Sequence, residues 1–229
     1  AYLTGILPIK KEKTQSALNN FDEFTMVSPS ILAQYIGFTE AEVQKLSDKY
    51  HQDFDKVKKW YDGYLLKDYQ VYNPRAVVSV MLKGEYKSYW SETASYEAIV
   101  PFINMNYDGL KTAIIEMLSG SSVKVNTATF KNDTVNIQSK DDVLTYMIHL
   151  GYLGYDADRK KSFIPNYEVA TAFELALQTG SWKEIAESIS KCDELLDETI
   201  DGNAERVAEL IELAHETYTS ILKYNDRSE

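Results

Sequence analysis

The sequence predicts a mainly helical α+β protein, and three observations lead to this fold class. Short stretches with helical apolar spacing and helix-capping residues fill the first half of the 229-residue chain. After Gly120 the apolar spacing changes to period two in β-branched residues, which indicates short strands. In the last fifty residues two amphipathic stripes are separated by a short turn with a glycine, which predicts a helical hairpin.

The chain opens with a predicted strand, followed by a loop and capped helices. Tyr2–Ile9 is rich in β-branched and aromatic residues, which favour a strand. Ser28 and Pro29 predict an N-cap and a first helical residue. Thr39 with Glu42 has the spacing of a capping box, which predicts that a second helix begins there.

The helical pattern continues to about residue 118. Residues 54–61 predict a third helix that ends at Asp62-Gly63, and Asn73-Pro74 opens a fourth that runs to Gly84. Two further helices are expected between residues 96 and 118. This first half therefore predicts a bundle of short helices.

The segment 120–179 has the element order of a winged helix. Period two predicts strands at 123–129 and 135–137, and Ser139 caps a helix at 143–150. Two runs, 152–155 and 162–164, form a predicted hairpin, and a helix follows at 168–177. Helix, helix and β-hairpin in this order are typical of a winged helix. A generic α+β bundle would have a similar order of helices and strands.

The acidity of the chain is concentrated at its C-terminal end. The formal net charge is −11, and residues 181–229 hold five basic and thirteen acidic residues. We interpret this as the solvated face of the helical hairpin. The single cysteine, Cys192, allows no internal disulfide, so we expect a reducing, cytoplasmic compartment. No run of 18 apolar residues occurs, so we expect no membrane span.

The motifs of nucleotide and nuclease chemistry give little support for catalysis. None of the ten glycines precedes a lysine, so the chain holds no phosphate loop. Two tripeptides, Glu85-Tyr86-Lys87 and Asp158-Arg159-Lys160, match half of a metal-dependent nuclease motif, but neither follows a strong strand. We interpret both as solvated surface. His149 is expected in the core, and no metal ligands or catalytic residues are assigned.

The predicted winged helix is a weak candidate for DNA binding. Residues 121–170 hold six basic and six acidic residues, and the expected recognition helix begins Lys-Asp-Asp. A winged helix that binds DNA would concentrate basic residues in this helix. The basic turn at Arg159, Lys160 and Lys161 is the candidate nucleic-acid contact, and packing against protein is the favoured use of the module.

Several motifs together resemble a known bacterial family. They are Leu3–Lys11, Ser16–Phe24, Trp60-Tyr61-Asp62-Gly63-Tyr64, Tyr72-Asn73-Pro74 and the run from His215 to Asn225. In order and spacing they resemble the AAA-ATPase-like proteins whose C-terminus carries a PD-(D/E)XK nuclease-like domain. The resemblance covers essentially the whole chain and implies that it is the middle of a longer protein.

This resemblance implies four regions and their roles. Residues 1–27 would be the last strand and loop of the ATPase-like core, 28–119 a helical lid, 120–179 the winged-helix-like module and 180–229 an acidic connector. ATP and Mg²⁺ would belong to the parent protein, with Thr4 at a nucleotide-sensing position. The other motif residues would be structural: Ser16, Asn19, Asn20, Trp60, Asp62, Gly63, Tyr64, Tyr72, Asn73 and Pro74.

We therefore expect a non-catalytic lid, regulatory and linker region. Its partners would be the upstream ATPase core and the downstream nuclease-like domain of the same chain. By itself this segment would be inactive, and lid closure over nucleotide would pass to the attached domains. The alternative is a winged-helix module that binds nucleic acid or protein.

Overall fold

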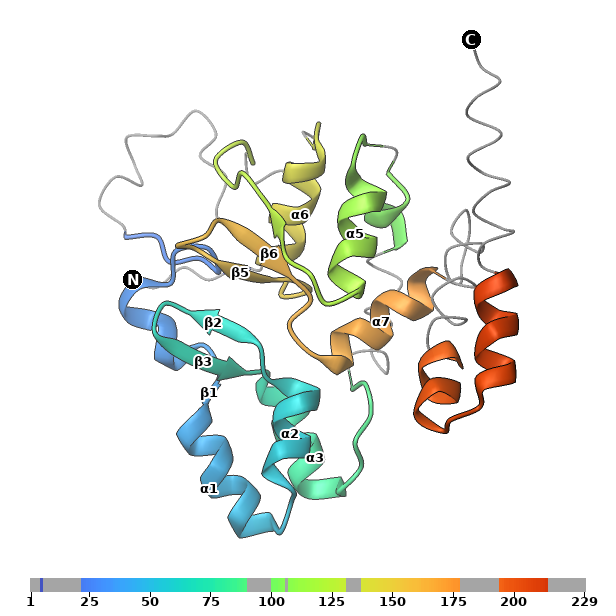
Figure 1. The fold of residues 1–229 in the computed structure, drawn as a ribbon. Coiled ribbons are helices and arrows are strands. Elements are labelled where there is room, and N and C mark those ends of the chain that lie inside the picture. The colour runs from blue at the N-terminus through green and yellow to red at the C-terminus, as the bar shows by residue number, and fades with distance from the viewer. Residues whose placement is uncertain are drawn as a thin grey trace. The chain divides into compact units, whose positions relative to one another are not determined.

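The computed structural model describes Gly5 and residues 22–89, 100–105, 107–130, 137–177 and 194–213. The chain forms two compact units, Ala1–Ala176 and Leu177–Glu229. The first unit holds two small antiparallel sheets, each with three strands and with helices beside it (Figure 1). The predicted α+β class is confirmed.

The first sheet packs with helices between residues 30 and 83. Its elements are the 3₁₀ helix η1 (Ser30–Tyr35), β1 (Phe38–Thr39), α1 (Glu40–Tyr50), α2 (Phe54–Tyr61), β2 (Tyr64–Leu66), β3 (Tyr69–Tyr72) and α3 (Pro74–Lys83). The strand order is β1-β3-β2, with Phe38 opposite Tyr72 and Tyr64 opposite Val71. The buried core between these elements consists of Val43, Val57, Tyr61, Tyr72, Ala76, Val77, Val80, Met81 and Tyr89.

Two helices of this part begin at the predicted capping residues. The Glu42 carboxylate accepts hydrogen bonds from the Thr39 backbone N–H (2.9 Å) and hydroxyl (2.8 Å), and these bonds lower the pKa of Glu42. At α3 the side chain of Asn73 accepts from Arg75 N–H at 2.9 Å, and Pro74 is the first helical residue. Both predictions are confirmed. They could be made from the sequence because capping depends on neighbouring residues only.

Other predictions for this part were wrong. β2 and β3 were not expected, and the segment between α2 and α3 is a hairpin of the sheet rather than a turn between helices. Ser28 is not an N-cap, because its backbone exchanges two 3.1 Å hydrogen bonds with Thr25. The following helix is a 3₁₀ helix that begins at Ser30, with Pro29 before it.

Along the chain, the strands of the second sheet come after α5 and before α7. Its part of the chain contains α5 (Leu110–Leu118), β4 (Val123–Lys124), α6 (Lys140–His149), β5 (Gly154–Asp156), β6 (Lys161–Phe163) and α7 (Tyr167–Leu177). The strand order is β4-β6-β5, so β4 pairs with the second strand of the hairpin. The predicted hairpin and the predicted helices at 143–150 and 168–177 are confirmed, and residues 100–103 are helical as expected.

The strand predicted at 123–129 is shorter than expected. Only Val123 and Lys124 pair as a strand. The Asn126 side chain accepts a hydrogen bond from Ala128 N–H, and its carbonyl accepts from the Thr129 hydroxyl, both at 3.2 Å. These local bonds close a turn in place of a strand. Of the predicted strand at 135–137, residues 135 and 136 lie outside the described residues, and Ile137 is not in a strand.

The second unit is described over residues 194–213. Residues 194–200 and 204–213 are helical, and a turn at 201–203 joins them. The guanidinium of Arg206 binds Glu194 of the first helix at 2.6 Å and Glu209 of its own helix at 2.9 Å. A helix, turn and helix are therefore present here as predicted, and the rest of the expected connector lies outside the described residues. None of the helices in the described segments is long and apolar enough to cross a bilayer.

Candidate functional site

One motif of the first part, Trp60–Tyr64, lies where this part meets the part that contains the second sheet. Trp60–Tyr64 runs from the end of α2 into β2, and Tyr72-Asn73-Pro74 joins β3 to α3. Across from Trp60–Tyr64 lie Gly151 and Pro165–Glu168. We call these two facing segments, Trp60–Tyr64 and Gly151 with Pro165–Glu168, the seam.

Gly63 is at the point of closest approach in the seam. Its φ of +104° is rarely adopted by residues with a side chain. A Cβ at this position would lie 1.8 Å from the carbonyl oxygen of Pro165, far inside van der Waals contact. Because the obstacle is backbone, no side-chain rotation could relieve it. Gly63 therefore lets the two backbones touch.

Two hydrogen bonds join the two sides of the seam, and a third lies beside it. The Tyr64 hydroxyl donates to the Gly151 carbonyl at 2.8 Å, and the Asn166 side-chain amide donates to the Asp62 carbonyl at 2.7 Å. Next to the seam, the backbone N–H of Tyr89 donates to the Glu168 carboxylate at 2.7 Å. Glu168 is 1% exposed, so this charge-assisted bond is shielded from water.

Aromatic packing completes the seam. The rings of Trp60 and Tyr167 meet edge to face, with centroids 4.7 Å apart and planes at 86°. This is a favoured geometry for an aromatic pair. The Lys59 amine lies 5.6 Å from the centroid of the Tyr167 ring. The seam thus combines backbone contact, hydrogen bonds and ring packing, all of which restrict sliding.

Asp62 places a carboxyl group against this seam with little solvent contact. Burial raises the pKa of Asp62, opposed by the Gly63 N–H and the Lys58 charge. Its Oδ1 atom and the Tyr72 hydroxyl are both buried, and the hydroxyl interacts with the Asp62 carboxyl group and favours its ionised form. Burial, and then the nearby Asp62 charge, raise the pKa of Tyr72 as well. Nearby, Lys58 and Glu40 form an ion pair at the surface.

Comparison with known proteins gives one partial likeness. The chain is 30% identical over 105 residues to an uncharacterized protein in the vnfD 5′ region of Azotobacter chroococcum mcd 1. The match covers 45% of this chain and 20% of that relative, so the chain spans about a fifth of the relative's length. No family model and no solved structure matches the chain. The AAA-ATPase-like family stays a prediction.

Several predicted site residues lie outside the described residues. They are Thr4, Ser16, Asn19 and Asn20. The nucleotide-sensing role of Thr4 therefore stays a prediction. Among the described residues, no three His, Cys, Asp or Glu side chains gather as they would around a metal ion.

The basic turn at residues 159–161 does not present three free charges on one surface. Arg159 donates its backbone N–H to Asp156 at 2.9 Å, and its guanidinium lies 3.8 Å from the same carboxylate. Lys160 has a left-handed backbone (φ +53°), and its carbonyl accepts from Val125 N–H at 3.0 Å. Lys161 belongs to β6, where it is paired with Lys124. The turn is therefore partly neutralised by its own acid.

The remaining candidates have structural surroundings. Glu85 and Lys87 form a 3.0 Å ion pair with both side chains more than 40% exposed, as expected for solvated surface. His149 is buried beside Phe130, and burial lowers the pKa of its imidazole to about 4. It is neutral at pH 7 and lies in the core as predicted. His215 and Cys192 lie outside the described residues.

Sequence reasoning missed the second side of the seam. Pro165, Asn166 and Glu168 carry no motif, and Asn166 and Glu168 lie 104 and 79 residues from their hydrogen-bond partners. A partial signal was available for Gly63, because Asp-Gly after a helix predicts a positive φ. Nothing in the local sequence indicates that a second backbone packs on that turn.

Proposed function

We propose that this chain is the lid, regulatory and linker region of a longer bacterial AAA-ATPase-like protein. In this proposal it couples a nucleotide-binding core, which holds ATP and Mg²⁺ and includes residues 1–27, to a nuclease-like domain downstream. Residues 28–119 act as the lid, 120–179 as the winged-helix-like module and 180–229 as the connector. The motif resemblance supports the family, and the protein would work in the cytoplasm without catalytic residues in this region.

The observation that carries the proposal is the seam. A lid that passes its closure to a neighbouring module needs a joint that neither slides nor opens. The Trp60–Tyr64 segment supplies such a joint: direct backbone contact at Gly63, hydrogen bonds from Tyr64 and to Asp62, and the Trp60–Tyr167 ring pair. One of the motifs that carry the family resemblance, Trp60–Tyr64, is therefore also the segment that joins the two parts.

The arrangement of the second sheet supports the winged-helix-like assignment. Helix, strand, helix and hairpin follow one another, and the first strand pairs with the last. The charges of this part favour packing against protein over binding to DNA. The first turn of α6 holds two acidic residues, Asp141 and Asp142, and Arg159 lies beside Asp156. Nucleic-acid binding through Arg159, Lys160 and Lys161 is therefore the weaker alternative.

Hydrogen–deuterium exchange of the longer protein, with and without Mg²⁺–ATP, tests this function. Binding of the nucleotide is established first by an independent titration. We expect nucleotide to change exchange in residues 28–119 and in 120–179 together. A Gly63→Ala variant should confine the change to residues 28–119. Exchange that is unaltered in both regions of a protein that binds ATP would contradict the proposal.

A further inference from the structure

The short helix η1 presents large apolar side chains to solvent. Four such side chains of η1 and its C-cap are exposed, namely Ile31 (71%), Leu32 (37%), Tyr35 (74%) and Ile36 (42%). We call these four residues the η1 surface. Because a 3₁₀ helix has three residues per turn, Leu32 and Tyr35 lie in one row along it, and Ile31 lies in the next. The remaining row holds Ala33, which is 1% exposed and packs against the first sheet. The helix is therefore held by a small residue, while its large residues face outward.

The sequence around the η1 surface carries no charge. No Asp, Glu, Lys, Arg or His occurs between Glu23 and Glu40, although 26% of all residues are charged. Leu82 of α3, which is 70% exposed, is in contrast followed directly by Lys83. The core of a protein interface is depleted in charged residues, and contiguous exposed apolar residues mark interaction sites. The η1 surface therefore has the composition of an interface.

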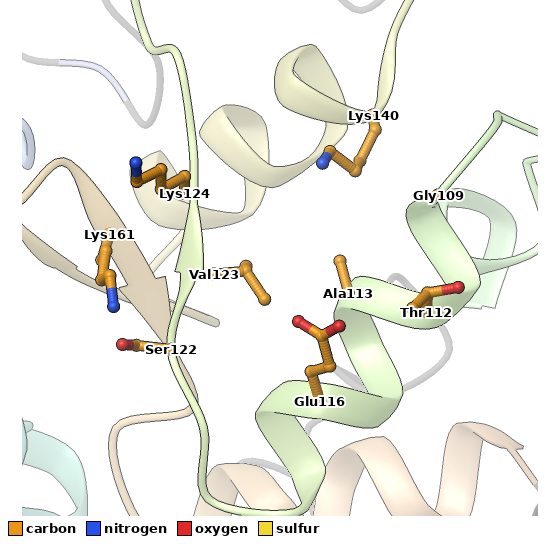
Figure 2. Close-up of a pocket in the computed structure, with 9 residues that line it drawn as sticks. All are labelled: Gly109, Thr112, Ala113, Glu116, Ser122, Val123, Lys124, Lys140 and Lys161. Atoms are coloured by element: carbon orange, nitrogen blue, oxygen red, sulfur yellow. The ribbon is translucent and has the colours of Figure 1, made fainter.

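A hollow of about 430 Å³ beside α5 has the opposite character. Three lysines and one glutamate are among the residues that line it. Figure 2 shows Lys124 and Lys161 on one side of β4, with Lys140 and Glu116 on the other side. An apolar partner that covered this hollow would bury unpaired charges, which is unfavourable. The η1 surface carries no such cost.

Both ends of η1 are fixed to the rest of the fold. Before it, Thr25 and Ser28 exchange two backbone hydrogen bonds of 3.1 Å, and Met26 packs against the buried cluster that contains Ala33. After it, Gly37 approaches β3 so closely that a Cβ would lie 2.4 Å from the Tyr72 carbonyl oxygen. The η1 surface is therefore preformed. A partner that binds it does not have to order this segment first.

We propose that the η1 surface is the docking site for the ATPase-like core of the same longer protein. It rests on the proposed function, in which residues 1–27 belong to that core and η1 follows them almost directly. The relative described above is about five times as long as its match to this chain, which leaves room for such a core. The core would cover the η1 surface and so hold the start of the lid.

A tethered core fits this surface better than a second copy of the chain. A stable interface between separate proteins takes about 20–30 residues from each side, and the η1 surface has far fewer. A domain that is joined to the surface by a short segment has an effective concentration in the millimolar range, so weak apolar contact is enough to hold it. The lack of charge agrees with this, because charge steers partners that arrive from solution.

Thiol labelling of the 229-residue chain and of the longer protein tests this docking site. Ile31→Cys is the probe and Leu82→Cys the matched control, because the two side chains are 71% and 70% exposed. Cys192 is replaced by serine, and peptide mass spectrometry follows the rate of maleimide modification at each position. In the 229-residue chain both thiols should react at similar rates. In the longer protein the Ile31→Cys thiol should react roughly ten times more slowly, because the core has to open first, and the Leu82→Cys thiol at an unchanged rate.

A charge placed in the η1 surface gives a second readout. Tyr35→Glu, added to the Ile31→Cys variant, would bury an unpaired carboxylate in the docked state, which is unfavourable. In the longer protein it should restore the labelling rate to that of the 229-residue chain, whereas Leu82→Glu should leave the protection intact. Because Tyr35 is exposed, Tyr35→Glu should keep the Tm of the 229-residue chain within about 2 °C of wild type, which shows that the variant folds. Protection that survives Tyr35→Glu would contradict the docking site.

Other labelling results would overturn the proposal as well. An equal rate for Ile31→Cys in both proteins would show that the core leaves the η1 surface open. Protection that is lost on dilution would identify a second copy as the occupant. Equal protection of the Ile31→Cys and Leu82→Cys thiols would indicate general shielding, and slow labelling of Ile31→Cys already in the 229-residue chain would show that this chain covers the surface itself.

Failure of the docking site and failure of the proposed function give different results. If the Ile31→Cys thiol is protected but Mg²⁺–ATP leaves hydrogen exchange unaltered, the docking site stands and the coupling function fails. If nucleotide changes exchange in both regions but the Ile31→Cys thiol is not protected, the docking site alone is refuted.

Discussion

Replacing Gly63 by alanine should open the seam. The new Cβ would lie 1.8 Å from the Pro165 carbonyl oxygen and 2.8 Å from Pro165 Cα. Ordinary contact needs more than 3.4 Å, so one backbone has to retreat by more than an ångström. The hydrogen bonds from Asn166 to Asp62 and from Tyr64 to Gly151 would then be stretched beyond their useful range.

The expected loss of stability follows from these contacts. An alanine held at φ +104° costs about 1–3 kcal/mol in backbone strain. Loss of two hydrogen bonds adds about 1 kcal/mol each. We therefore expect Gly63→Ala to lower the free energy of unfolding by about 3–5 kcal/mol. For a domain of this size that is a fall in Tm of roughly 10 °C or more.

Gly84→Ala is the matched control. Gly84 also has a positive φ, +68°, but the nearest atom to an added Cβ is the Gln52 side-chain nitrogen at 3.6 Å. Only the left-handed backbone cost of about 1–2 kcal/mol applies. Denaturant unfolding followed by circular dichroism measures both variants. The reasoning is refuted if Gly63→Ala is no more destabilising than Gly84→Ala.

Two predictions concern buried ionisable groups. Because burial raises the pKa of Asp62 above 3.8, its ionised form costs stability at higher pH. Asp62→Asn should therefore raise Tm, or leave it unchanged, at pH 7 and give no gain near pH 4; a lower Tm at pH 7 would contradict this. For His149, whose pKa falls to about 4, the unfolded chain binds the extra proton, so stability should decline by up to about 3 kcal/mol as pH falls from 6.5 to 4. His149→Phe should flatten this decline in thermal scans, and an unchanged slope would exclude His149 as its source.

Helix starts and hairpins that depend only on residues close in the sequence could be predicted. Thr39 with Glu42, Asn73-Pro74 and Ser139 each mark a helix start that the structure contains. The hairpin of β5 and β6 was also predicted, because its strands are separated only by a short polar turn. β2 and β3 were missed because the helix stop at Asp62-Gly63 and the helix start at Asn73-Pro74 led to the segment between them being interpreted as a turn.

The seam depends on contacts that the sequence does not place. Tyr64 binds Gly151 across 87 residues, and no pattern near either residue indicates the other. Tertiary contact, rather than local composition, creates the seam.

A spin-label distance measurement tests the joint most directly. Nitroxides at Val78→Cys on α3 and Thr112→Cys on α5, both exposed, report on the two sides of the seam when Cys192 is replaced by serine. The account predicts one narrow distance distribution, which Gly63→Ala broadens and Gly84→Ala leaves unchanged. A broad or multimodal distribution in the protein with an intact seam would contradict the claim that the two parts move as one.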